Sequence, residues 1–264
     1  MGIMEIIRYT LLLVQIAALT GCFVLTLRMI HRDRRDLFLI FYAFGLLNYL
    51  LSDLFWLAFT LLRQGARMPF AGNVIGEWAV FLLFAAVLEI EFANILMPTI
   101  KEMVWTVLFA AVNTVFWIAW SGEWFEDIIT GLVFGYFLCV CVRSLKQIRA
   151  LSAAEWKILG AWSLMLAGLQ ALTFVPSGFV SWTADLCCYC TILAGIFLVY
   201  ARILYAFRKG EAAEKLIALS FAGCAFSIVC LYMSSEPVYF ILGLVNTGAV
   251  LLMFLAVRKK VEEG

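Results

Sequence analysis

The sequence contains few charged residues, a single histidine and no long polar segment. Of its 264 residues, 14% are charged and 65% are hydrophobic, whereas a soluble domain has about 25% charged and about 45–50% apolar residues. A chain this apolar cannot cover itself with polar surface, so its surroundings must be lipid. The formal net charge of +1 excludes a bulk electrostatic attraction to nucleic acid.

The motifs of common enzymes and metal sites are also missing. No GxSxG, HExxH, Walker A or GxGxxG pattern occurs. His31 is the one histidine, so ligation of haem by two histidines is excluded, and we expect no metal and no cofactor. Cys187, Cys188 and Cys190 lie in an apolar run, where lipid disfavours a thiolate, so we expect them to be small helix-packing residues. No catalytic residue is predicted, and enzymatic activity is the less favoured interpretation.

Long apolar runs dominate the sequence instead. A helix needs about 20 apolar residues to cross about 30 Å of hydrocarbon, and all four prolines fall in gaps between such runs. Because the runs are continuous rather than alternating, a barrel is excluded. The sequence predicts an all-α polytopic membrane helix bundle. Its nine predicted spans cover residues 9–30, 37–62, 74–97, 103–120, 125–145, 156–175, 181–207, 216–232 and 238–257.

The basic residues predict the orientation of the chain. With these nine spans, all but three of the 19 Lys and Arg residues lie on one side, and the exceptions are Arg8, Arg63 and Arg67. The positive-inside rule then places the N-terminus outside and the C-terminus in the cytoplasm, which requires an odd number of spans. The segment 19–22 matches a lipoprotein cleavage box, but the apolar run continues after Cys22 and disfavours cleavage. The short loops suggest a bacterial plasma membrane.

A weak internal similarity relates spans two to five to spans six to nine. Glu77–Leu96 and Asp185–Leu204 each begin with an acid and align in one register. Four spans return the chain to the same side, so two such copies would be parallel and related by an axis along the membrane normal. The predicted division is a first helix and loop (1–35) followed by units 36–150 and 151–264. The alternative is a chance similarity between apolar helices.

Three acidic residues in the outer half of the bundle form the predicted binding site. Asp53 lies about 14 Å deep in the second span, and Glu77 and Asp185 lie about one turn inside the third and seventh spans. A charged residue at the bilayer centre costs about 2.5–3.5 kcal/mol. We therefore expect the three carboxyl groups to face a common interior and to bind a cation, an amine or a proton. In the alternative interpretation they are neutral and hydrogen-bonded between helices.

Aromatic and amide side chains complete this predicted site. Trp56 and Trp78 are close in sequence to an acid and could offer their ring faces to an organic cation. Tryptophans are also typical of the membrane interface, which is the competing interpretation. Asn246 supplies an amide from the last span.

Two further acids occupy the inner half of the third span. Helical spacing places Glu91 on the same stripe as Glu77 and places Glu89 off that stripe. Glu91 and Arg202 lie at similar depth on the two helices that the repeat makes equivalent, so we predict that they form a structural polar pair. A purely structural role is the favoured interpretation for Glu89 and Glu91.

Three functions are compatible with this pattern, besides that of a structural subunit. An acid-lined bundle favours transport of a small cationic or proton-coupled solute. A sensor or receptor that signals to a separate partner protein is the first alternative, and an intramembrane enzyme acting on a lipid or isoprenoid is the second. The expected partners are the lipid bilayer, a small molecule or cation, and possible partner proteins.

Overall fold

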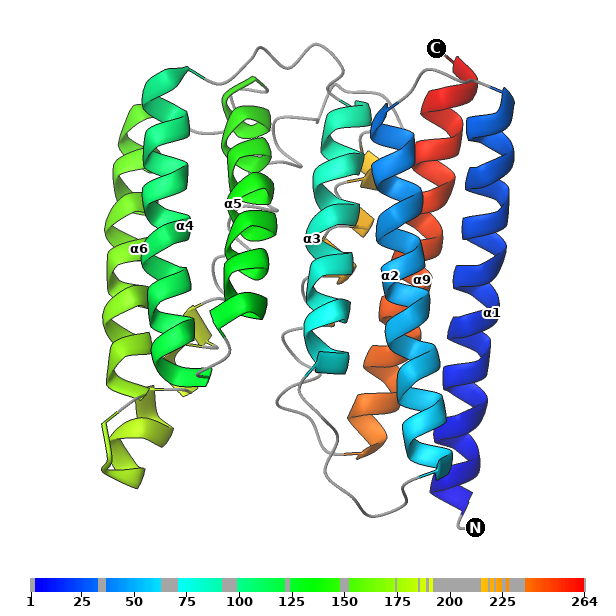
Figure 1. Cartoon of the computed structure of the whole chain (residues 1–264), viewed down its shortest axis with the longest axis horizontal. Helices are drawn as coiled ribbons and strands as arrows, with labels where there is room; N and C mark the ends of the chain where they lie inside the picture. Colours follow the sequence, from blue (N-terminus) through cyan, green and yellow to red (C-terminus); the bar gives the residue numbers. More distant parts are fainter. Residues whose placement is uncertain are drawn as a thin grey trace. The chain divides into compact units, whose positions relative to one another are not determined.

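The computed structural model describes residues 3–32, 37–62, 71–91, 99–121, 124–147, 152–173, 175–184, 186–188, 190–191, 215–217, 219–220, 222–224, 227 and 236–263. Every regular element within these residues is an α-helix (Figure 1), which confirms the predicted all-α class. The labelled helices are α1 (Ile3–Arg32), α2 (Leu37–Leu62), α3 (Ala71–Glu91), α4 (Ile100–Ser121), α5 (Trp124–Gln147), α6 (Ala153–Thr173) and α9 (Glu236–Glu263). The described residues of 178–191 and 215–227 are also helical.

Four of these helices are long and apolar enough to cross a membrane. The stretches are Glu5–Arg32, Leu37–Leu62, Trp124–Ser144 and Phe240–Glu262, and each meets the requirement of about 20 apolar residues. In α3 the apolar stretch is shorter, Trp78–Ile90. These helices support a helical membrane protein. The count of nine spans stays a prediction, because much of 181–207 and 216–232 lies outside the described residues.

The chain divides into two compact units. The first comprises residues 1–144 together with 257–264, and the second comprises residues 145–256. Helix α9 therefore begins in the second unit and ends in the first. This division does not test the predicted repeat, because most of the second copy of the aligned segment, 185–204, lies outside the described residues.

In the first unit, α2 packs between α1 and α3 (Figure 1). The inner face of α1 carries Leu19, Cys22 and Thr26, which are buried and follow each other at helical spacing. At the interface of α2 with α3, Gly45 faces Leu83, and Ser52 faces Gly76. Since the partner number falls as the α2 number rises, α2 and α3 are antiparallel neighbours.

Helices α3 and α5 run parallel and contact each other through phenylalanine rings. The ring centroids of Phe81 and Phe134 are 5.2 Å apart, those of Phe81 and Phe137 are 5.4 Å apart, and those of Phe84 and Phe137 are 6.0 Å apart. These spacings are in the range of favourable aromatic pairs. Because both residue numbers rise together along the contact, residues at similar distances from the starts of α3 and α5 lie at the same level.

Small residues bring α4 and α5 together. A Cβ atom added at Gly131 would overlap the hydroxyl of Thr114, and one added at Gly135 would lie 2.9 Å from Cβ of Ala110. Glycine therefore permits a close approach of the two helices, as is common in membrane bundles. The falling partner number shows that α4 is antiparallel to α5, so the chain reverses direction twice between α3 and α5.

In the second unit, a capping box fixes the start of α6. The Ser152 backbone N–H and hydroxyl donate to Oε2 of Glu155 at 2.8 and 2.7 Å, and the Glu155 N–H lies 3.4 Å from the Ser152 hydroxyl. After α6, the Ser181 hydroxyl donates to the Thr173 carbonyl at 2.7 Å. This bond ties the following helical segment to the end of α6.

Candidate functional site

Among the predicted site residues, Asp53 is the one ionisable side chain that the structure describes, and it is buried. Only 6% of its surface is exposed, and its neighbour Ser52 is 5% exposed. Asp53 lies within the stretch of α2 that is long and apolar enough to cross a membrane, roughly nine residues or about 14 Å from its end. This burial places the acid in the interior of the first unit, whereas the common interior expected for the three acids stays a prediction. Such a position is costly and calls for a partner or a function.

The neighbours of Asp53 satisfy only part of its carboxyl group. The side chain of Gln15 on α1 is hydrogen-bonded to it, whereas Oδ2 has no hydrogen-bond partner among the described residues. The nearby amide of Asn48 donates to the Phe44 carbonyl of its own helix at 2.8 Å. A proton on Oδ2 of Asp53 would avoid the burial of a negative charge that no hydrogen bond stabilises there.

Glu77 lies on α3 at the level of Asp53. Gly76 contacts Ser52, since a Cβ atom at Gly76 would lie 3.1 Å from the Ser52 hydroxyl, and Glu77 is the next residue of α3. The backbone thus brings the two predicted acids to the same height of the α2–α3 interface. The Glu77 side chain itself lies outside the described residues.

Two further predicted site residues, Asp185 and Asn246, belong to the second unit. Asp185 is outside the described residues. Asn246 on α9 is 3% exposed, and its Oδ1 lies 3.3 Å from the hydroxyl of Ser227, which also donates to the Cys224 carbonyl at 3.0 Å. Asn246 therefore joins α9 to the 215–227 segment as a buried interhelical polar contact. Its predicted role in ligand binding stays a prediction.

The two tryptophans of the predicted site differ in their surroundings. Trp56 is 39% exposed, as expected for a side chain that contacts lipid or the interface. Trp78 is half-buried, and its indole N–H donates to the Thr130 hydroxyl on α5 at 2.7 Å. Thr130 in turn donates to the Glu126 carbonyl at 2.9 Å. Trp78 is thus a contact between α3 and α5.

We expect Thr130→Val to destabilise the protein by about 0.6 kcal/mol, the average for interhelical hydrogen bonds in membranes, and by no more than about 1.7 kcal/mol. Valine removes the acceptor and leaves the Trp78 N–H unpaired, whereas Thr130→Ser retains the hydroxyl and serves as the control. The measurement is the unfolding midpoint in detergent. A valine variant no less stable than the serine variant would show that the hydrogen bond contributes nothing.

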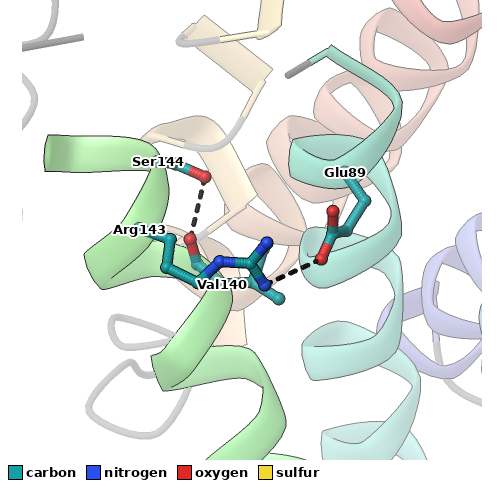
Figure 2. Close-up of polar contacts among 4 residues, drawn as sticks. All are labelled: Glu89, Val140, Arg143 and Ser144. Atoms are coloured by element: carbon teal, nitrogen blue, oxygen red, sulfur yellow. Dashed lines mark hydrogen bonds and ion pairs between the residues drawn. The ribbon is translucent and has the colours of Figure 1, made fainter. Parts of the chain in front are cut away.

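At the opposite end of the α3–α5 contact, Glu89 and Arg143 form a buried ion pair. The Nη1 atom of Arg143 lies 3.5 Å from Oε1 of Glu89, and the two side chains are 13% and 8% exposed. Figure 2 shows the guanidinium reaching from α5 toward the carboxylate on α3, next to the bond from the Ser144 hydroxyl to the Val140 carbonyl. The two charges compensate each other, as expected for a pair with a structural role.

The predicted pair of Glu91 and Arg202 cannot be compared with this contact. The Glu91 side chain and Arg202 lie outside the described residues. The sequence does contain a signal for the observed pair, because Glu89 and Arg143 lie near the ends of two helices that run in the same direction. They are therefore at matching depth.

Within the described residues, Cys187, Cys188 and Cys190 form no metal site and no disulfide. Cys187 and Cys190 are exposed, and Cys188 is half-buried. No group of three potential metal-ligating side chains occurs in the described part of the chain. The expected helix-packing role of these cysteines stays a prediction.

Comparison with known proteins identifies no relative: no protein family, curated protein sequence or solved structure matches this chain. The functional interpretation therefore depends on the chemistry of Asp53 and its neighbours.

Proposed function

We propose that this protein transports a small cationic or proton-coupled solute across the membrane, with Asp53 as the acid on the route. The observation that carries the proposal is a carboxyl group buried in a helix long and apolar enough to cross a membrane, with one oxygen lacking a hydrogen-bond partner among the described residues. Ionisable residues kept inside membrane bundles at such cost are typical of ion and solute pathways. Glu77, on α3 at the same level, is the second acid of the proposed route.

The proposed orientation follows from the distribution of basic residues, with the N-terminus outside and the C-terminus in the cytoplasm. The last turns of α1 carry His31 and Arg32, and α9 ends with Lys260 in its last turn. We place the protein in a cell membrane, and in this orientation Asp53 lies nearer the outer face.

The test is uptake into proteoliposomes, with labelled choline as an organic cation and labelled rubidium as an inorganic cation. Both ions cross lipid slowly on their own. We expect the wild type to take up at least one of them, and Asp53→Asn to reduce that uptake to the level of protein-free vesicles. Asparagine retains the size and polarity of the side chain but cannot carry a negative charge.

The matched control is Asn48→Leu, which changes a polar residue of the same helix whose amide bonds its own backbone. This variant should retain wild-type uptake. Wild-type uptake by Asp53→Asn, or uptake of neither cation by the wild-type protein, would contradict the proposal, and wild-type uptake by Glu77→Gln would remove Glu77 from the proposed route. No described contact favours a sensor or an enzyme over transport.

A further inference from the structure

The surroundings of Asp53 supply too few ligands for a metal cation. Its described hydrogen-bond partner is the single amide of Gln15, whereas hard cations such as Ca²⁺ and Mg²⁺ take about six or more oxygen ligands. The adjacent Ser52 hydroxyl lies against Gly76 of α3. A bare cation bound here would retain too few oxygen contacts to replace its hydration shell.

A negative charge on Asp53 is equally poorly supported in the observed conformation. No Lys, Arg or His residue forms an ion pair with Asp53 within the described residues, and Oδ2 has no hydrogen-bond partner there. Burying an ionised carboxylate without a compensating charge is far more costly than burying a neutral polar group. The neutral acid is the form that this geometry accommodates.

We propose that the ion bound by Asp53 is a proton, and that Gln15 is the positioning residue that orients the carboxyl group. This inference rests on the proposed transport function and names its coupling ion. In the closed interface the proton is covalently bound to Oδ2, while the other oxygen accepts the Gln15 amide N–H. When water reaches the site, the O–H bond breaks, its electron pair stays on the carboxylate, and a water molecule becomes hydronium. The reverse transfer reloads the acid.

The groups around Asp53 are consistent with a proton site. From α1 the facing group is Gln15, and the buried Cys22 lies two turns further along that helix. On α3 the titratable residue at this level is Glu77. On α2 itself, Tyr49 lies one turn before Asp53 and Trp56 lies one turn after it. A basic residue that would hold Asp53 ionised is missing from this described set.

The test is infrared difference spectroscopy of the full chain in lipid, titrated from acidic to alkaline pH. We expect the carbonyl band of a protonated carboxylic acid that shifts in D₂O, is lost in Asp53→Asn and reappears at a changed frequency in Asp53→Glu. Gln15→Leu should shift the band without abolishing it, whereas Asn48→Leu should leave it unchanged. A purely structural role for Gln15 would leave the frequency of the band unmoved.

Two outcomes separate this inference from the proposed function. If Asp53-dependent uptake of choline or rubidium follows a sodium gradient, ignores an imposed pH gradient, and occurs without the infrared band, the proton assignment is wrong while transport stands. If the band depends on Asp53 but neither cation is taken up, proton binding stands and the transport proposal fails.

Discussion

Arg143→Met is expected to lower the free energy of unfolding by about 3–5 kcal/mol, the usual cost of removing one member of a buried ion pair. The substitution leaves the Glu89 carboxylate 8% exposed and without its guanidinium partner. Methionine fills much of the volume of the arginine stem, so the loss reflects charge more than packing. The measurement is denaturant-induced unfolding in detergent.

The chain offers a matched control for this substitution. Arg258 pairs with Glu262 at 2.7 Å, but these side chains are 50% and 54% exposed. Arg258→Met should therefore change stability by no more than about 1 kcal/mol. The double variant Glu89→Leu with Arg143→Met should recover most of the loss, because replacing a whole buried pair by apolar residues is nearly neutral. Equal effects of Arg143→Met and Arg258→Met would refute the buried-pair interpretation.

Gly45→Leu should destabilise the protein by about 3 kcal/mol, the upper end of the usual cost of overpacking. Even a Cβ atom at this position would lie 2.9 Å from Cγ of Leu83 and 3.1 Å from its backbone nitrogen. The side chain can rotate away, but the nitrogen belongs to α3 and moves only with that helix. The expected result is a lower unfolding midpoint together with weaker α2–α3 packing.

Gly21→Leu on α1 is the control for this prediction, because no atom lies within 4 Å of a Cβ atom added there. It should be neutral or stabilising, since leucine has a higher helix propensity than glycine. Adding Leu83→Ala to Gly45→Leu should restore part of the lost stability. Equal unfolding midpoints for Gly45→Leu and Gly21→Leu would show that the close approach of α2 to α3 does not restrict the residue at position 45.

The sequence is sufficient to predict α2 and the burial of its acid. The apolar run 37–62 matches α2 at both ends, because charged segments bound it on either side. Asp53 was expected in the bundle interior because an isolated charge in lipid is costly, and its side chain is buried, with 6% of the residue exposed. Its contact with Gln15 could not be predicted, since that depends on the register between α1 and α2.

The Glu89–Arg143 pair shows why helical periodicity misses some buried charges. Assigning one polar stripe to the third span assumes that a single face of the helix is buried. In α3 the consecutive residues 83–87 are all buried, because the helix contacts α2 on one side and α5 on another. A helix enclosed in this way can bury an acid outside the main stripe, and depth along parallel helices then predicts the partner better than periodicity does.

The position of this pair also has a consequence for biosynthesis. Arg143 follows Glu89 by 54 residues. At about 5–20 residues per second, the ribosome therefore adds Arg143 to the chain on the order of 3–10 s after Glu89. During that interval the acid on α3 has no guanidinium to neutralise it. We therefore expect Glu89 either to be protonated or to stay near the headgroups until α5 is synthesised.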